Sequence, residues 1–253
     1  MKVIAVILTK NEARHIADCI ASVAWADGVL VSDSFSEDET VPLAQAAGAA
    51  VEQRTFEGWA VQRNGSLDSA ARMGADWVFF VDADERSTPE LAGEIRVVTG
   101  TRPEAGWSVP RYNFIAGKQV RHGGFYPDYQ MRLLRVGKAR YDLSRPVHEV
   151  VELDGSEGFL QNHLIHYNYD TWAQFHAKQR RYGAMEADIL AQRGIRPRPH
   201  NFVLQPLREF RRRYLTLEGY RDGWHGLKLA SLLAYYYGFY PYWVLMKRFR
   251  STE

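Results

Sequence analysis

Two aspartates that follow an apolar stretch could hold a metal ion. Residues 77–81 are aromatic and β-branched, which predicts a strand buried on both faces. Asp82 and Asp84 come next, and in an extended segment they would project to the same side. Two neighbouring carboxylates favour Mn²⁺ or Mg²⁺, with phosphates as further ligands. The alternative is a solvated acidic turn before the helix that Ser87 and Pro89 indicate.

The residues before the aspartates predict the sheet that would position them. Apolar β-branched runs alternate with segments of helical periodicity, which implies an α/β fold: a mostly parallel sheet with helices on both faces. Ser36 and Glu39 have capping-box spacing and predict the start of one helix. The four predicted strands cover residues 3–8, 29–31, 50–52 and 77–81, and the helix before the last strand covers 59–73.

Polar side chains follow three of these strands. Thr9, Asp33 and Asp82 fall at strand carboxyl ends, where ligands of parallel sheets bind, so we expect one crevice that holds a nucleotide. Neither the G-x-G-x-x-G nor the G-x-x-x-x-G-K-[ST] phosphate loop occurs. This pattern argues against dinucleotide dehydrogenases and P-loop NTPases, and it leaves a metal to hold the phosphates.

The second half of the chain predicts a different arrangement. Short strand-like runs at 107–110, 112–116 and 129–134 indicate mixed or antiparallel strands. Thr171 and Gln174 then predict the start of a helix that ends near Gly194. We therefore expect a catalytic domain over residues 1–170 and a helical carboxy-terminal region over 171–253.

Composition indicates an ordinary globular protein with an asymmetric charge. The net charge is +2, yet residues 180–250 are markedly basic. The lone Cys19 cannot form an internal disulfide, and the apolar run at 3–8 is too short for a secretory core, so we expect a cytoplasmic location. A nucleic-acid partner is not expected.

An aromatic, apolar segment near the carboxy terminus predicts a contact surface. Residues 227–246 contain one charge and are flanked by basic clusters at 211–213 and 247–250. Gly238 and Pro241 interrupt the segment, which favours a helix in the interface of an anionic membrane over a span. The alternative is a buried domain interface or a homodimer contact.

Several short motifs, in their order and spacing, resemble the family 2 glycosyltransferases of the GT-A fold. The resemblance is to the bacterial branch that builds lipopolysaccharide core or other surface glycans. Phe35 and Glu39 depart from the family pattern, which has glycine at both positions. This departure leaves Asp33 in place. The motifs lie at 8–12, 31–40, 62–64, 80–85, 132–133, 147–149 and 166–167.

The resemblance implies the reaction and the roles of particular residues. The reaction would be an inverting transfer of a hexose from a nucleoside diphosphate sugar, with UDP as the expected carrier, to a glycan or lipid-linked hydroxyl. Glu149 would be the general base, with Glu152 and Glu157 as nearby competitors. The implied donor-binding residues are Thr9, Asn11, Glu12, Asp33, Arg63 and Asp82, and the implied metal ligands are Asp82, Asp84 and His166.

Two other functional classes remain open from the sequence. A sugar nucleotidyltransferase shares the parallel-sheet core, but it usually has a glycine- and arginine-rich loop after the first strand, and residues 9–12 contain no glycine. A non-catalytic scaffold could keep the fold without the chemistry. The presence of Asp82, Asp84 and Glu149 argues against that loss.

Overall fold

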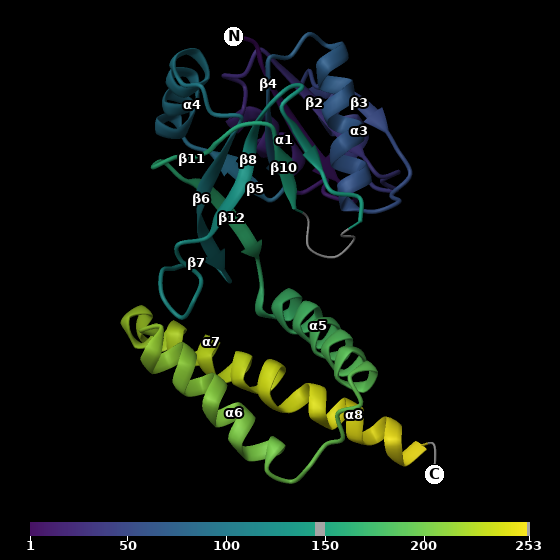
Figure 1. Ribbon diagram of the computed structural model, residues 1–253, viewed down its shortest axis with the longest axis vertical. Coiled ribbons are helices and arrows are strands. Elements are labelled where there is room, and N and C mark those ends of the chain that lie inside the picture. The colour runs from purple at the N-terminus through teal and green to yellow at the C-terminus, as the bar shows by residue number, and fades with distance from the viewer. Residues whose placement is uncertain (145–149, 252–253) are drawn as a thin grey trace. The chain divides into compact units, whose positions relative to one another are not determined.

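The chain forms two compact units, which we describe separately. The computed structural model, shown in Figure 1, describes residues 1–144 and 150–251. The first unit comprises residues 1–111 and 128–166, and the second comprises 112–127 and 167–253. The stretch 112–127 therefore belongs to the second unit although it lies between two parts of the first.

The parallel sheet predicted from the sequence is confirmed in the first unit. Its four parallel strands lie in the order β3-β2-β1-β4, and helices connect them. A continuous apolar run such as that of β4 suits a central strand because both of its faces are covered. The elements of this part are β1 (Val3–Thr9), α1 (Ile16–Ser22), β2 (Gly28–Asp33), α2 (Thr40–Ala46), β3 (Ala50–Gln53), α3 (Trp59–Arg72) and β4 (Trp77–Asp82).

Alternate residues of β1 feed two separate cores, one on each face of the sheet. Val3, Ala5 and Ile7 pack with buried residues of α1, of α2 and of α4 (Pro89–Thr101). Ile4 and Val6 pack on the opposite face with buried residues of α3. This division follows from the two-residue period of a strand and explains why every β1 residue is apolar up to Leu8.

Antiparallel strands extend the sheet beyond β4. β8 (Tyr129–Arg135) pairs with β4 and with β6 (Gly106–Ile115), and β12 (Leu164–Tyr169) pairs with the short β5 (Glu85–Ser87). Mixed or antiparallel strands were expected here, and the pairings confirm them. The remaining strands of this unit are β9 (Ala139–Tyr141), β10 (Val151–Leu153) and β11 (Glu157–Phe159).

One predicted helix cap is wrong and another is confirmed. Ser36 was expected to cap α2, but its hydroxyl donates to Asp33 instead. The residue at the cap position is Glu39, and its side chain makes no capping hydrogen bond. Phe35, where the resembled family usually has glycine, has a φ of 58°, a left-handed conformation that glycine adopts most easily. In the second unit, Thr171 and Gln174 form the expected capping box of α5 (Trp172–Gln192).

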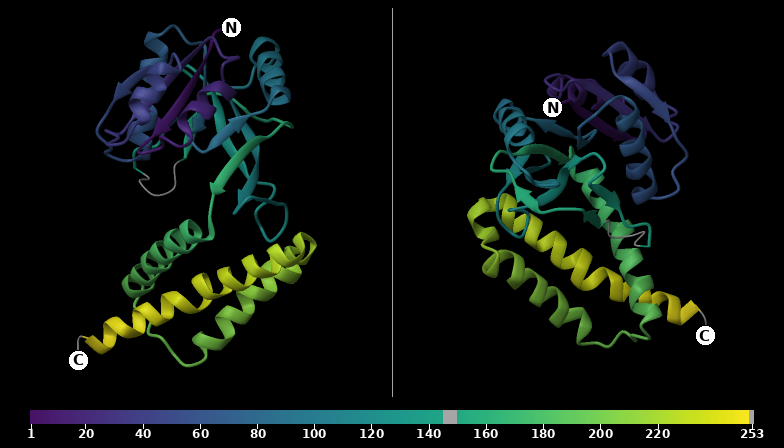
Figure 2. Two further views of the ribbon diagram at one scale, coloured as in Figure 1. Left: turned by 180° about the vertical axis from the view of Figure 1, so that it is seen from behind. Right: turned by 45° about the horizontal axis from the view of Figure 1, so that its top comes forward.

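The second unit is mainly helical. The helix α6 (Asn201–Arg211) continues into η1 (Arg212–Thr216) and lies beside a nearly continuous helix, as Figure 2 shows. That helix consists of α7 (Gly223–Leu233), η3 (Ala234–Phe239) and α8 (Tyr240–Ser251). This unit also contains β7 (Lys118–Val120) and η2 (Gly219–Asp222).

The aromatic segment 227–246 contributes to the core of the second unit. Leu229, Leu233 and Tyr236 are buried against Ile115 and Phe175. Much of its apolar surface is therefore covered by packing within the unit. Within residues 1–144 and 150–251, none of the helices is long and apolar enough to cross a membrane.

A close approach in the first unit gives a test of the packing. A Cβ atom added at Gly158 in β11 would lie 2.3 Å from the ring of the buried Trp107. We expect Gly158→Ala to lower the free energy of unfolding by about 1–3 kcal/mol because the ring must move. Gly93, inside α4, has open space around its Cα, so Gly93→Ala is the matched control.

The control should stabilise the protein by up to about 1 kcal/mol, because alanine favours the helix. Urea unfolding of the two variants and the unchanged protein measures the difference. A Gly158→Ala variant as stable as Gly93→Ala would contradict the packing described for Trp107.

Candidate active site

Three predicted site residues meet at one edge of the parallel sheet. Thr9 at the end of β1 is the register partner of Asp33 at the end of β2. Asp82, at the end of β4, is the register partner of Leu8. The carboxyl ends of three strands therefore bring Thr9, Asp33 and Asp82 together, as the strand pattern predicted.

Thr9 and Asp33 differ in how their polar atoms are used. The Thr9 hydroxyl is buried and has no hydrogen-bond partner in the part of the chain that the structure describes. The Asp33 carboxylate is also buried, but it accepts hydrogen bonds from the Ser36 amide at 2.8 Å, the Ser36 hydroxyl at 2.5 Å and Gln53 Nε2 at 3.0 Å. Asp33 thus organises the turn after β2, and Thr9 keeps hydrogen-bonding capacity for a ligand.

Asn11 and Glu12 join the loops after β1 and β2. The backbone N–H of Asn11 donates to the Ser36 hydroxyl at 2.8 Å, and the side-chain Oδ1 of Asn11 accepts from the backbone N–H of Glu37 at 2.8 Å. The Glu12 amide donates to the Thr40 hydroxyl at 2.8 Å. These contacts fix two neighbouring loops at the sheet edge where a nucleotide is predicted.

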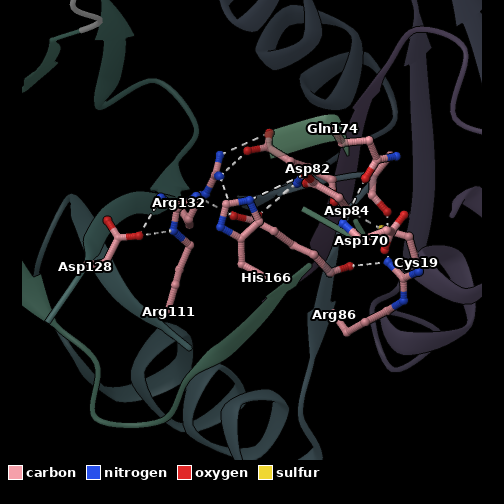
Figure 3. A network of polar contacts seen from close by, with 12 residues as sticks. Cys19, Asp82, Asp84, Arg86, Arg111, Asp128, Arg132, His166, Asp170 and Gln174 are labelled. Carbon is pink, nitrogen blue, oxygen red and sulfur yellow. Dashed lines mark hydrogen bonds and ion pairs between the residues drawn. The ribbon is translucent and has the colours of Figure 1, made fainter. Parts of the chain in front are cut away.

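Asp82 is paired with two arginines. Arg132 Nη1 donates to Asp82 Oδ1 at 3.3 Å, and Arg132 Nη2 makes a second, short contact with Oδ2 (Figure 3). Arg63 Nη2 lies 3.5 Å from Asp82 Oδ1, while its guanidinium group lies over the rings of Phe80 and Tyr141. The structure therefore brings together Arg63 and Asp82, two of the predicted donor-binding residues.

These arginines set the ionisation of Asp82. Burial by itself raises the pKa of the carboxyl group, but the positive charges of Arg132 and Arg63 outweigh it and hold the pKa well below its usual range. Asp82 is therefore a carboxylate at neutral pH, with its charge largely balanced by the protein.

Glu85 links Asp82 to a wider network that our sequence analysis did not assign. Its fully buried Oε1 accepts from Arg132 Nη2 at 2.7 Å and Arg111 Nη1 at 2.8 Å, and its Oε2 accepts from the Asp82 amide at 2.9 Å. Arg111 also donates to Asp128 at 2.7 Å. The signal in the sequence was an arginine, Arg132, within the otherwise apolar end of a predicted strand.

Asp84 lies with His166 instead of with the arginines. The antiparallel pairing of β5 and β12 sets His166 opposite Glu85, and His166 Nε2 lies 3.5 Å from Asp84 Oδ2. The expected strand geometry is wrong here, because β4 ends at Asp82 and a turn covers residues 83–84. Alternation along a strand thus does not set the direction of Asp84, and the two aspartates have different partners.

Asp84 and His166 fit two ligands of a divalent ion. A carboxylate oxygen and an imidazole nitrogen suit Mn²⁺, and Mg²⁺ binds through few carboxylates when phosphates supply oxygens. Among the described residues, no group of three or more His, Cys, Asp or Glu side chains could hold a metal ion by itself. Phosphate oxygens of a bound donor could supply further ligands.

The predicted general base, Glu149, lies outside the described residues. Its competitor Glu152 is in β10, and Glu157 in β11 accepts a hydrogen bond from the Ser108 hydroxyl at 2.7 Å. That contact gives Glu157 a structural partner. The role of Glu149 stays a prediction.

The pairing of Asp82 predicts a pH dependence of stability. Because its pKa is lowered in the folded protein, Asp82 stabilises the fold above its unfolded pKa of about 3.9, and the contribution is lost as the pH falls further. We expect Asp82→Asn to cost about 1–3 kcal/mol at neutral pH. Its free energy of unfolding should fall less steeply than that of the unchanged protein below about pH 4.

Urea unfolding at a series of pH values measures both quantities. Asp18→Asn is the control, because that side chain is 82% exposed and lies 3.9 Å from its arginine partner. Equal acid dependence of the Asp82→Asn variant and the unchanged protein would show that the ion pair does not lower this pKa.

Two similar proteins match this chain over different lengths. The lipopolysaccharide core biosynthesis glycosyltransferase LpsC of Rhizobium meliloti (strain 1021) is 29% identical over 239 residues, which cover 92% of this chain and 87% of LpsC. An uncharacterized glycosyltransferase of Rickettsia felis is 39% identical over 98 residues, 38% of this chain and 34% of that protein.

Solved structures with some likeness include S. aureus TarS 1-349 in complex with UDP. It has a TM-score of 0.49 and 14% identity, with 100% of this chain and 92% of that chain covered. Glucosyl-3-phosphoglycerate synthase from Mycobacterium tuberculosis, with Mn²⁺, UDP and glucosyl-3-phosphoglycerate, has a TM-score of 0.35 and 22% identity over 46% of this chain and 44% of that chain.

The family assignment rests on a model of the family rather than on these structures. The model described as glycosyl transferase family 2 matches residues 4–136, which include all but the first residue of the four parallel strands β1 to β4 and the strand that carries Arg132. This assignment separates the protein from the nucleotidyltransferases considered above. With its mostly parallel sheet covered by helices on both faces, the chain belongs to glycosyl transferase family 2 and has the GT-A fold.

Proposed function

We propose that the protein is an inverting, metal-dependent hexosyltransferase that uses a UDP-sugar. Its acceptor is a hydroxyl of a glycan or a lipid-linked molecule such as lipopolysaccharide core. The observation that carries the proposal is the pair of Asp84 and His166, 3.5 Å apart beyond the end of β4 in a family 2 chain. The name of LpsC, which covers 92% of this chain, supports the acceptor class.

The sheet edge supports the binding of a nucleotide. The buried Thr9 hydroxyl lacks a partner among the described residues, and a base could supply one. Asp33 accepts three hydrogen bonds, which leaves one lone pair of its carboxylate for a uracil N–H. Arg63 would lie near the diphosphate, and Asp82, with Asn11 and Glu12 in the adjacent loops, would face the ribose and base.

Asp84 and His166 would hold Mn²⁺ or Mg²⁺ in this proposal, with Asp82 beside them. The bound ion supplies positive charge that stabilises the departing nucleotide diphosphate. Asp84 is the more available carboxylate, because Asp82 is already paired with Arg132 and Arg63. The two aspartates then have different roles: Asp82 orients the arginines, and Asp84 binds the ion.

Inversion at the anomeric carbon requires a base on the face opposite the leaving group. Glu149 would take the proton from the acceptor hydroxyl as the acceptor oxygen bonds to the anomeric carbon. At the same time the bond from that carbon to the diphosphate oxygen breaks, and the electron pair leaves with UDP. The negative charge that develops on the departing diphosphate would be balanced by Arg63 and by the bound ion, on the side of the anomeric carbon opposite the base.

The proposed acceptor also indicates where the enzyme works. A lipid-linked acceptor lies at a membrane surface, so we place the protein in the bacterial cytoplasm, peripherally on the inner face of the plasma membrane. The buried free thiol of Cys19 is compatible with a reducing compartment.

Replacing Asp84 tests the metal site and the proposed function together. We expect Asp84→Ala to abolish the part of UDP affinity that depends on Mn²⁺, a loss of at least about tenfold, because a carboxylate ligand is removed. Titration calorimetry of UDP with and without Mn²⁺ measures it. The control is Asp18→Ala, which removes an exposed carboxylate on α1.

Metal-dependent affinity that survives in Asp84→Ala would reject the assignment of this ligand. If the unchanged protein bound no UDP or UDP-sugar under any condition, the scaffold alternative would replace the enzyme. Circular dichroism of each variant establishes that the fold is intact.

Replacing Glu149 tests the proposed base. Glu149→Gln should keep UDP affinity and lower turnover by about 10²-fold or more, the usual contribution of a general base. Release of UDP from a panel of UDP-hexoses, with lipopolysaccharide core as acceptor, measures turnover and identifies the sugar. Near-normal turnover in Glu149→Gln, with loss in Glu152→Gln, would assign the base to Glu152.

A further inference from the structure

The helix α6 presents large apolar side chains to solvent. Val203, Leu204 and Leu207 are 57%, 58% and 60% exposed, and Leu215, in η1, is 56% exposed. Leu204, Leu207, Arg211 and Leu215 follow one another at spacings of three or four residues, so they share one side of the helix. Apolar residues in such a row are expected to have a partner.

The opposite side of α6 is already packed. Phe202 lies 5.4 Å from Phe239 in η3, centroid to centroid. A Cβ atom at Gly238 would lie 2.6 Å from Pro206, so the two helices are in close contact there. The exposed row therefore faces away from the core of the second unit.

The segment that carries the exposed row is rich in positive charge. Seven arginines but only one acidic residue, Glu209, lie between residues 193 and 216. Glu209 is paired with Arg212 at 2.9 Å and Arg213 at 2.6 Å. Arg208 and Arg211 are exposed, and the structure records no ion pair for either within the described residues.

We propose that this surface, the outer face of α6, binds an anionic phospholipid membrane. The outer face comprises Val203, Leu204, Leu207, Arg208, Arg211 and Leu215. Its leucines can enter the acyl boundary while the arginines contact headgroup phosphates. A second copy of the chain is a poorer partner, because a two-fold contact through this face would bring the arginines of both copies together.

The outer face also differs from the aromatic segment 227–246. Leu229, Leu233 and Tyr236 of that segment are buried in the core of their own unit and cannot reach lipid without unfolding it. The outer face of α6 needs no such rearrangement. The proposal deepens the proposed function, because it names the surface through which the enzyme would meet a lipid-borne acceptor.

Vesicle flotation of the full chain tests the proposal in the absence of donor and acceptor. The protein should float with vesicles of phosphatidylcholine mixed with phosphatidylglycerol, but not with phosphatidylcholine alone. High salt should release it, because the interaction is partly electrostatic. Replacing Arg208 and Arg211 with glutamine should weaken partitioning about 30-fold, the equivalent of about 1 kcal/mol per arginine.

Two controls match the variants. Arg102→Gln with Arg140→Gln removes the same charge from side chains that are 58% and 55% exposed in the first unit, and it should leave partitioning within about twofold of the unchanged protein. Leu204→Gln with Leu207→Gln should abolish flotation, whereas Val97→Gln, at a residue 61% exposed on α4, should not.

Three results would overturn the proposal. The first is no flotation of the unchanged protein with anionic vesicles at low salt. The second is equal flotation of the outer-face variants and their controls. The third is a dimer, seen by sedimentation, that the leucine variants dissociate while vesicle binding is absent. UDP binding is measured separately on the same variants, so a failure of membrane binding is distinct from a failure of the proposed enzyme function.

Discussion

The candidate site depends on the buried ion pair between Glu85 and Arg132. Glu85 has no exposure to solvent, and removing one partner of such a pair typically costs about 3–5 kcal/mol. Arg132, on β8, reaches both Glu85 and Asp82, so one guanidinium group ties the end of β4 to the start of β5 and to a neighbouring antiparallel strand. Arg111 extends the same connection to β6 and Asp128.

The network around this ion pair gives the two aspartates different partners. Asp82 is held by arginines and has a lowered pKa, so its charge is already balanced before any ligand arrives. Asp84 lies one turn beyond the strand, next to His166, which β12 places there through its pairing with β5. A bound ion would therefore compete with arginines for Asp82, but not for Asp84.

The sequence was sufficient for the parallel sheet and for the edge where Thr9, Asp33 and Asp82 meet, because strand period and strand order are local and repetitive signals. It failed where a polar side chain had two geometries open to it. Ser36 has the spacing of a helix cap, but its hydroxyl donates to Asp33. Asp84 was expected in an extended segment, but the strand ends at Asp82 and a turn follows. The Glu85 network was missed because its partners, Arg111 and Arg132, are remote in sequence and meet only through antiparallel pairing.

The helical unit shows why mean hydropathy and surface exposure can disagree. The segment 227–246 is apolar on several sides of its helix, and tertiary packing therefore covers much of it, including Leu233 and Tyr236. Helix α6 contains more charge, yet the unit leaves one row of its apolar residues open, including Leu204 and Leu207. A helix with such a row is strongly amphipathic, and an amphipathic basic helix meets an anionic surface more readily than a helix that is apolar on several sides and largely covered by its own unit. The position of the apolar residues around the helix, rather than their number, decides which segment is available to a membrane.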